Sequence, residues 1–524
     1  MAASVTPRRA PLAVRTVLGL AAAVLVAHLL TNLFTPYGVH RDAFLYMAMG
    51  RHLRLFRMDF PPFIAILSQI SRAMSDALVV LRLGPALAGT ALVVMAALFA
   101  REFGGGRCAQ LLSALVVATV PLFLRTGNLF QPVIFDQLWW TLALFALARL
   151  GRNGFAGEAR WWIVLGVAGG LGLLTKFSIL FLGAGVLIAL LLGPQRRTLL
   201  TRWPWLTLAI VLVIGAPSIV GQLRLGFPVV GQMRELQNGQ LEHVSYLGFL
   251  SGQFLMLGPS LALAALGLVA LLAGRRYQAF RAVGLACAAS FLILMLLHGK
   301  AYYAGPIYPA LLGAGAAALA AWADGRVAAG RVTYANGVQA AAVVLMLAYG
   351  AITLPLGLPI VPPARMARYA AALGVASTTE TNRGTVLSIP QDYADMLGWK
   401  TRVAAVARVY HALPVADREQ AVIVADNYGD AGAIDFYGPR YGLPSAVAPT
   451  GSYWFFGPGT KPGKVIIKVG GDREDLVQYF GSVSLADRVD EPWVVPEEQN
   501  LPIWICRQPR GTLQQVWPRF AGEN

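Results

Sequence analysis

The sequence predicts a polytopic α-helical membrane protein with a smaller α/β domain at its C-terminal end. Hydrophobic residues make up 56% of the 524 residues, charged residues only 13%, and the mean hydropathy is +0.58. A soluble domain of ordinary composition has about a quarter of its residues charged. The apolar residues are also gathered into runs of roughly the 20 residues that a helix needs to cross a bilayer. Most of the chain is therefore expected to lie in lipid.

About eleven segments are apolar and long enough to be membrane spans. They are expected at residues 12–34, 77–100, 108–125, 132–150, 161–175, 177–193, 204–223, 247–273, 282–298, 304–323 and 337–360. Residues 1–360 would then form a transmembrane domain, in which residues 35–76 are the first external loop.

Arginine is concentrated in alternate short loops between these segments, where acidic residues are few. Arg8, Arg9 and Arg15 precede the first segment, for example, and Arg101 and Arg107 follow the second. The positive-inside rule then places the N-terminus in the cytoplasm, and an odd number of spans places the C-terminal domain outside the inner membrane. This distribution accounts for the formal net charge of +17 without nucleic acid as a partner. The three cysteines have neither metal-ligand spacing nor the pattern of a disulfide framework.

The tail, residues 361–524, has ordinary polarity and alternating elements. Strands are expected in VLSIP (386–390), AVIVAD (421–426), KVIIKV (464–469), WVVP (493–496) and LPIWIC (501–506). Helices are expected over residues 391–413 and 474–481. The tail is therefore expected to be a soluble α/β domain on the external face. GDAGAIDFYG (429–438) lacks the glycine spacing of a dinucleotide site.

The stretch Val39–Pro62 in the first external loop mixes apolar and basic residues, a pattern typical of a helix lying in the membrane interface. We interpret it as the floor of an active site at the membrane surface. A carboxylate at Asp42 could accept a proton from a hydroxyl group or hold a divalent cation, although an acid near the end of a span often only meets water. Asp59 could act similarly, but the Pro61-Pro62 that follows also suits a turn or a helix cap.

Lys176 is a lone cation in the apolar run LGLLTKFSILF, at the expected external end of its span. Such a lysine either extends its ammonium to the interface or meets an anion. The turn HGKAYYAGPIYP (298–309) brings His298, Lys300, Tyr302 and Tyr303 to the same face. These residues suit a phosphate clamp for a lipid-linked donor, and they equally suit an aromatic belt with one cation.

Three further groups could contribute to a site. Asp136 lies just inside the span at 132–150, where an acid is either functional or paired with Arg125. Glu242 and His243 lie in the external loop at 224–246, and their spacing does not choose between acceptor and metal contacts. If a divalent cation is a cofactor, Asp42, Asp59 or Asp136 would hold it.

The order of these motifs resembles that of the dolichyl-phosphate-mannose protein mannosyltransferase-like proteins of glycosyltransferase family 39, including the lipid A aminoarabinose transferases. HRDAFLYMAMGRHL, LRLGPALAG, GLLTKFSILFL and GKAYYAGPIYPAL carry the resemblance over residues 1–360. PQDYADMLGW and DNYGDAGAIDFYGPRYGLP resemble the extracytoplasmic domain of many bacterial members.

The resemblance implies a GT-C fold and an inverting transferase that moves a sugar from a polyprenyl-phosphate donor to an acceptor on the non-cytoplasmic face. Asp42 would be the catalytic base or would activate the acceptor with the help of a metal ion. Lys176 would neutralise the donor phosphate, and Lys300, Tyr302 and Tyr303 would lie near the carrier head group. Many members have Glu after the aspartate, whereas Ala43 follows here. The acceptor could be a lipid, a polysaccharide or a protein.

Two other functions fit the sequence less well. A transporter or flippase of a lipid-linked glycan would show repeated halves and polar groups near mid-membrane, whereas the ionisable groups here gather at external span ends. A binding module on a membrane anchor needs far fewer than eleven spans. The transferase interpretation expects Asp42 and Lys176 to converge on one cavity at the outer leaflet.

Overall fold

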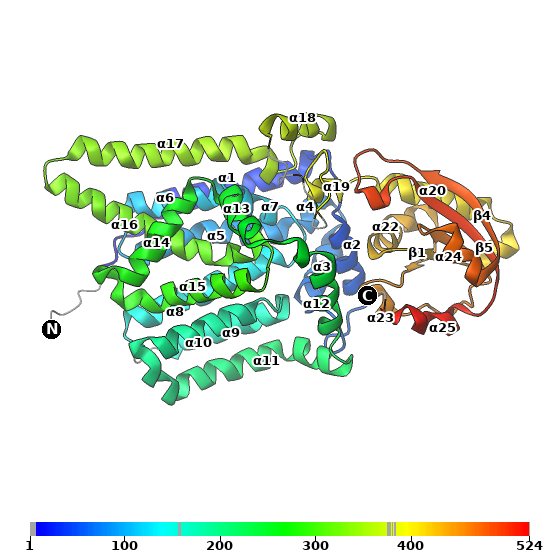
Figure 1. Cartoon of the computed structure of the whole chain (residues 1–524), viewed down its shortest axis with the longest axis horizontal. Helices are drawn as coiled ribbons and strands as arrows, with labels where there is room; N and C mark the ends of the chain where they lie inside the picture. The colour runs from blue at the N-terminus through cyan, green and yellow to red at the C-terminus, as the bar shows by residue number, and fades with distance from the viewer. Residues whose placement is uncertain (1–6, 156–158, 375–378, 380, 382–383, 523–524) are drawn as a thin grey trace. The chain divides into compact units, whose positions relative to one another are not determined.

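The computed structural model describes residues 7–155, 159–374, 379, 381 and 384–522 (Figure 1). The chain divides into two compact units. The first contains Met1–Phe34, Arg82–Val220 and Leu241–Ile360, and the second contains Thr35–Leu81, Gly221–Gln240 and Val361–Asn524. Residues 35–81, which include the predicted first loop, and residues 221–240 therefore pack with the tail.

The first unit is helical throughout its described residues. Its α-helices are α1 (Val14–Phe34), α5 (Leu83–Glu102), α6 (Arg107–Thr119), α7 (Pro121–Gly127), α8 (Val133–Arg152), α9 (Ala159–Thr175), α10 (Ile179–Leu192), α11 (Arg202–Arg224, which ends in the second unit), α13 (Tyr246–Leu257), α14 (Ser260–Ala273), α15 (Arg281–Leu296), α16 (Tyr308–Ala328) and α17 (Val332–Gly357). Short 3-10 helices are η1 (Pro194–Leu200), η2 (Leu241–His243), η3 (Arg275–Phe280) and η4 (Ala301–Ile307).

Three bends interrupt the helices of this unit, and a proline lies at each. Two fall within the spans expected at 108–125 and 247–273, and the third follows the span expected at 177–193. The bends are 60° between α6 and α7, 111° between α10 and η1, and 109° between α13 and α14. Pro121, Pro194 and Pro259 stand at these breaks. Proline removes a backbone donor and disfavours helical geometry in the residue before it, so the helix ends there.

The predicted count of eleven spans is not confirmed. Among the described residues, seven helices are long and apolar enough to cross a membrane, or up to ten if each bent pair is one span. The segment expected at 161–175 forms α9, which has 17 residues. Each expected span is nevertheless helical, and the chain is a multi-pass membrane protein.

Small residues allow the helices of this unit to approach closely. A Cβ added to Gly185 of α10 would lie 2.7 Å from the Ala286 carbonyl of α15, and one added to Gly267 of α14 would collide with the Leu311 carbonyl of α16. Close backbone approach at small residues is the usual way in which membrane helices associate.

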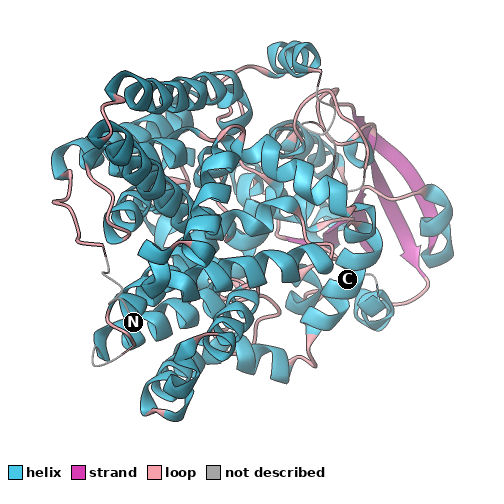
Figure 2. Ribbon diagram, turned by 60° about the vertical axis from the view of Figure 1, so that its left-hand side comes forward, coloured by secondary structure: helices cyan, strands magenta, loops and turns pink. Residues whose placement is uncertain are grey.

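The second unit combines short helices with one sheet, whose strands are magenta in Figure 2. Residues 35–81 and 221–240 contribute the helices α2 (Arg41–Arg51), α3 (Phe63–Met74), α4 (Leu78–Leu81) and α12 (Pro228–Gly239) to this unit. The tail adds α18 (Pro363–Leu373), α19 (Gln391–Ala394), α20 (Trp399–Ala412), α21 (Val415–Gln420), α22 (Tyr428–Tyr437), α23 (Ser452–Phe456), α24 (Arg473–Tyr479) and α25 (Leu513–Val516), with 3-10 helices η6 (Gly438–Tyr441), η7 (Pro496–Glu498) and η8 (Trp517–Gly522). Its strands are β1 (Ala421–Ala425), β2 (Ala446–Val447), β3 (Val465–Val469), β4 (Phe480–Val489) and β5 (Leu501–Pro509).

The sheet has the order β2-β1-β3-β5-β4, parallel from β2 to β3 and antiparallel from β3 to β4. Val422, Ile466 and Trp504 on its central strands form one side of a core that includes Leu476 of α24 and Trp517. The strands expected at 421–426, 464–469 and 501–506 are present as β1, β3 and β5. Because β1 ends at Ala425, the chain enters α22 directly beyond the strand end.

Candidate active site

The N-terminus of α2 is fixed to the start of the tail. The Arg41 N–H donates a hydrogen bond to the Asp395 carbonyl at 2.9 Å. His40 is the N-cap residue, and its Nδ1 accepts a hydrogen bond from the Asp42 N–H at 3.1 Å. An N-cap side chain satisfies one of the backbone donors that a helix leaves without an intrahelical partner. Asp42 is thereby held in the first turn of α2.

The remainder of α2 packs within the second unit. All residues from Ala43 to Gly50 are buried. The Phe44 ring meets Trp399 edge-on at 5.4 Å between ring centroids, and a Cβ on Gly432 of α22 would lie 2.5 Å from the Phe44 Cβ. Only glycine permits this approach of α22 to α2. The expected location of this segment in the membrane interface stays a prediction.

Tyr428, the first residue of α22, holds one oxygen of Asp42. Its hydroxyl donates a hydrogen bond to Asp42 Oδ1 at 2.9 Å, and the Arg41 guanidinium lies 5.0 Å from the Tyr428 ring centroid. Burial raises the pKa of Tyr428, and the Asp42 carboxylate raises it further, so the phenol stays a proton donor at neutral pH. The Asp42 side chain is 32% exposed. An oriented and accessible carboxylate can accept a proton from a hydroxyl group.

Three carboxylates surround the His40 ring. Nε2 lies 3.7 Å from Asp392 Oδ1 and 3.8 Å from Asp395 Oδ2, and Nδ1 lies 4.0 Å from Asp42 Oδ2. Burial lowers the pKa of His40, but these carboxylates outweigh burial and the net direction is upward. Among the described residues, His40, Asp392 and Asp395 are the one group of His, Cys, Asp and Glu with metal-ligand spacing. Asp42 lies beside this group but outside it.

A buried ion-pair network supports α22. Arg402 of α20 pairs with Asp430 at 3.2 Å and also with Glu498, and all three side chains are buried. Asn427 caps α22 by accepting hydrogen bonds from two backbone N–H groups. Burial raises the pKa of Asp430, and the Arg402 guanidinium opposes the shift. The network fixes the helix that presents Tyr428.

Asp59 is buried in a second hydrogen-bonded cluster of this unit. Its Oδ2 accepts a hydrogen bond from Ser452 at 2.7 Å and another from Gln232 at 3.4 Å, and its carbonyl accepts one from Gln222 at 2.5 Å. Burial raises the pKa of Asp59 to about 6, although the hydrogen bond from Ser452 opposes the shift. These contacts join the first loop, α11, α12 and α23. Asp59 therefore has a structural role in this cluster, and a catalytic role for it stays a prediction.

In the first unit, Lys176 lies in the break between α9 and α10. Its Nζ is 4.1 Å from the Tyr303 ring centroid and 5.6 Å from that of Tyr302. Such distances are those of cation–π contacts. Thr175 ends α9, and its Oγ1 accepts a hydrogen bond from Trp139 Nε1 at 3.0 Å. The lysine predicted at a span end and the tyrosines predicted on a distant turn are therefore neighbours.

Asp136 lies in the same cluster. Its Oδ2 accepts a hydrogen bond from Ser178 at 2.8 Å, and the Lys176 ammonium attracts its carboxylate. The Asp136 side chain is buried, and its Oδ1 accepts no hydrogen bond among the described residues. The structure therefore places Ser178, Lys176 and Trp140 beside the Asp136 carboxyl.

The remaining predicted residues of this unit divide into two groups. His298 stands at a positive φ of 53°, its Nδ1 is 2.7 Å from the Val244 carbonyl, and its ring stacks on Tyr246 at 4.6 Å. It therefore fixes the turn that carries Lys300. Glu242 and His243 are exposed and lie 3.7 Å apart, and neither belongs to a metal-ligand group found among the described residues.

Lys176 and Asp42 belong to different compact units. Each site is defined within its own unit, and the expected convergence of the two residues stays a prediction.

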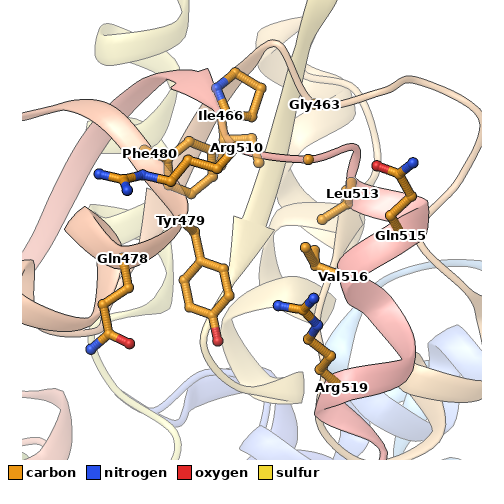
Figure 3. Close-up of a pocket in the computed structure, with 12 residues that line it drawn as sticks. Gly463, Ile466, Gln478, Tyr479, Phe480, Arg510, Leu513, Gln515, Val516 and Arg519 are labelled. Carbon is orange, nitrogen blue, oxygen red and sulfur yellow. The ribbon is translucent and has the colours of Figure 1, made fainter.

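A separate pocket of about 370 Å³ lies in the tail beside α24, β5 and α25 (Figure 3). Its polar lining residues are Gln478, Tyr479, Arg510, Gln515 and Arg519, and its apolar ones include Ile466, Phe480, Leu513 and Val516. None of the predicted site residues lines it, and among the described residues no carboxylate does. The pocket therefore shares no residue with the candidate sites described above.

The sequence and the structure were compared with those of known proteins. Residues 59–220 match the family model described as dolichyl-phosphate-mannose-protein mannosyltransferase. The structure matches ArnT from Cupriavidus metallidurans bound to undecaprenyl phosphate, with a TM-score of 0.60 over 94% of this chain and 98% of that one, at 15% identity. The chain has an ArnT-like GT-C fold. The predicted resemblance is confirmed at this level.

Two further solved structures share this fold. ArnT from the same organism in the apo state matches with a TM-score of 0.59, at 16% identity, over 93% of this chain and 97% of that one. The oligosaccharyltransferase AglB from Archaeoglobus fulgidus, in complex with an inhibitory peptide and a dolichol-phosphate, matches with a TM-score of 0.51, at 14% identity, over 86% and 69%. No curated protein sequence matches the chain. Nothing in these comparisons supports the transporter alternative.

Proposed function

We propose that the protein is an integral-membrane glycosyltransferase that moves a sugar from a polyprenyl-phosphate carrier to an acceptor on the non-cytoplasmic face of the membrane. The observation that carries this proposal is the oriented carboxylate of Asp42 in a chain with an ArnT-like fold. The ArnT and AglB structures contain undecaprenyl phosphate and dolichol-phosphate, which supports a polyprenyl phosphate as the carrier. A hexose or a pentose fits the proposal, as does a lipid, polysaccharide or protein acceptor.

In this mechanism Asp42 is the general base. The acceptor hydroxyl oxygen attacks the anomeric carbon on the face opposite the phosphate, which inverts the configuration. The bond between that carbon and the phosphate oxygen breaks, its electron pair leaves with the polyprenyl phosphate, and the hydroxyl proton passes to Asp42. Tyr428 holds Oδ1 of the carboxylate, so the other oxygen has a defined direction. A positioned base accelerates such a step by about 10²–10⁴-fold.

Lys176 is assigned to the leaving phosphate. The negative charge on the carrier phosphate increases as the sugar departs, so a fixed cation stabilises the transition state more than the ground state. Tyr302 and Tyr303 limit where the Lys176 ammonium can lie, and the Asp136 carboxylate attracts it. The isoprenoid tail of the carrier stays in lipid, which suits a cation at the end of an apolar helix.

The orientation follows from the arginine distribution. Arginines in alternate short loops support a cytoplasmic N-terminus in the inner membrane, and they support a tail on the external face. The second unit, which contains both Asp42 and the tail, would then work outside the cytoplasm, where the proposed acceptor is.

Replacing the base tests the function. Asp42→Asn keeps the size of the side chain and is expected to lower transfer by roughly 10²–10⁴-fold with an unchanged thermal unfolding midpoint. Asp76→Asn is the control, because Asp76 is also an acid between the first two expected spans and its contact is an exposed ion pair with Arg72 at 2.8 Å. The assay measures polyprenyl phosphate released from a panel of radiolabelled undecaprenyl-phosphate sugars, with host membranes supplying the acceptor. Near-full transfer by Asp42→Asn would refute the proposed role.

A further inference from the structure

We propose that His40, Asp392 and Asp395 form a binding site for one divalent transition-metal ion, with zinc as the expected ion. The three side chains come from the first loop and from the start of the tail, more than three hundred positions apart in the sequence. One possible ligand atom from each lies within 4.8 Å of the other two. The sequence analysis expected any metal at Asp42, Asp59 or Asp136, so this site is a different one.

Local structure explains how two of the ligands come together. Asp392 lies in the single-turn helix α19, and Asp395 is its C-cap residue. Residues three apart on a helical turn lie on the same face, which directs both carboxylates toward the His40 ring. The Arg41 N–H donates to the Asp395 carbonyl at 2.9 Å, so the two segments are also joined by their backbones.

The separations suit a tetrahedral metal. His40 Nε2 lies 3.7 Å from Asp392 Oδ1 and 3.8 Å from Asp395 Oδ2. Bonds of about 2.0 Å from zinc to imidazole nitrogen and carboxylate oxygen place tetrahedral ligand atoms about 3.3 Å apart. Contractions of about half an ångström therefore convert both pairs to coordination geometry. Such shifts are within the reach of side-chain rotation alone.

Burial and charge give a second, independent indication. The side chains of His40 and Asp395 are only 3% and 6% exposed. Asp395 Oδ1 is buried and accepts no hydrogen bond among the described residues. A buried carboxylate oxygen without a partner is unfavourable unless a cation compensates it. The Asp392 side chain is 31% exposed, so an ion has a path from solvent.

The donor set indicates the class of metal. One imidazole and two carboxylates suit zinc and its transition-metal neighbours, whereas magnesium and calcium prefer sites made of oxygen ligands only. Three protein ligands leave the fourth tetrahedral position to water. The two ligand carboxylates and the nearby Asp42 bring three negative charges to the ring of His40, and the Arg41 guanidinium offsets part of this charge. A dication matches the excess that remains.

The proposed ion would also change the partner of His40 Nδ1. In the present structure His40 Nδ1 accepts a hydrogen bond from the Asp42 N–H. Because Nδ1 is the acceptor, a neutral His40 ring has its proton on Nε2. A metal on Nε2 moves that proton to Nδ1, whose nearest carboxylate oxygen is Asp42 Oδ2 at 4.0 Å. Metal-bound histidines commonly donate their other N–H to a carboxylate. This link to the base rests on the proposed function, whereas metal binding itself does not.

Metal content of the full-length protein in detergent tests the proposal. The protein is stripped with a chelator, dialysed against zinc chloride and analysed by elemental mass spectrometry. Wild type is expected to hold about one zinc per chain and to unfold at a higher temperature with zinc than without it. Asp392→Asn/Asp395→Asn is expected to lose both properties. The control Asp472→Asn/Asp475→Asn removes two exposed carboxylates at the same spacing and should behave as wild type.

Cobalt loading provides a second readout. Wild type with Co²⁺ is expected to show the visible absorption of a tetrahedral site with nitrogen and oxygen ligands, and Asp392→Asn alone should lose it. That single variant changes a partly exposed side chain and keeps the test valid if the double variant fails to fold. Zinc binding by the double variant equal to that of the control would overturn the proposal, as would wild type that retains no zinc above background.

Discussion

Removing the Tyr428 hydroxyl is the most discriminating perturbation of the second unit. Tyr428→Phe deletes the hydrogen bond to Asp42 Oδ1 at 2.9 Å and leaves the ring against which Arg41 packs. A hydrogen bond to a charged group contributes about 1.5–3 kcal/mol. If that energy orients the base, the loss corresponds to roughly 10- to 150-fold in transfer rate. The loss should appear in kcat, with the KM for the donor unchanged, because Tyr428 belongs to the proposed base and not to the phosphate site.

The assay follows polyprenyl phosphate release at saturating and at limiting donor, so that kcat and KM are obtained separately. Tyr441→Phe is the matched control, since Tyr441 lies in the same tail and its hydrogen bond with His411 Nε2 uses only its backbone carbonyl. A purely structural role for Tyr428 would lower the unfolding midpoint and leave the kcat of the folded fraction near that of wild type. That outcome, or a kcat within about twofold of wild type in a stably folded variant, would refute the reasoning.

Three further predictions concern the phosphate site and stability. Lys176→Ala should raise the donor KM or lower kcat/KM by roughly 10²-fold, whereas Lys464→Ala, which removes an exposed lysine, should not. Donor kinetics of Lys176→Ala equal to those of wild type would contradict the assignment of Lys176 to the donor phosphate. Because burial raises the pKa of Asp59 from 3.8 to about 6, its contribution to stability is present below about pH 4 and is lost as the pH rises through 6. The free energy of unfolding of Asp59→Asn should therefore rise relative to that of wild type between pH 4 and 7, by up to about 3 kcal/mol. A difference that does not change with pH would exclude this origin. Glu102→Gln removes the buried carboxylate that pairs with the guanidiniums of Arg9, Arg149 and Arg152, and it should destabilise the first unit by about 3–5 kcal/mol. The control Glu242→Gln changes an exposed side chain and should leave stability unchanged, and equal unfolding midpoints for the two variants would contradict this prediction.

The helices of the first unit were predictable because their signal is local. Each expected span is an apolar run, and composition alone identifies such a run as helical in lipid. The bends at Pro121, Pro194 and Pro259 were also present in the sequence as prolines. What composition does not give is whether two helices joined at a bend cross the membrane as one span, because that depends on how they pack.

The tail shows where local patterns fail. β4 was missed because most of its residues are exposed on an edge strand, so the sequence has no run of buried apolar residues there. The helix expected over 391–413 divides at Gly398, whose φ of +78° interrupts helical geometry. The strand expected at 493–496 is absent, and the one at 386–390 has only an isolated bridge residue.

The candidate site was only partly predictable. Asp42 and Lys176 were found from an unusual residue at an expected span end, which is a local observation. Tyr428 is 386 positions from Asp42, and no local pattern links two residues at that separation. His40 adjoins Asp42 in the sequence and could have been weighed as a ligand, but its two carboxylate partners lie in the tail. Contacts of this kind are products of tertiary packing, which local patterns in a single sequence do not reveal.

The most direct test of the central claim is a structure of the protein with undecaprenyl phosphate bound. The account predicts that a phosphate oxygen lies within salt-bridge distance, about 4 Å, of Lys176 Nζ. It also predicts that the ammonium keeps its contact with the Tyr303 ring. A carrier phosphate bound elsewhere, with Lys176 in contact only with Tyr303 and Asp136 as in the present structure, would contradict the assignment of Lys176 and the transferase mechanism built on it.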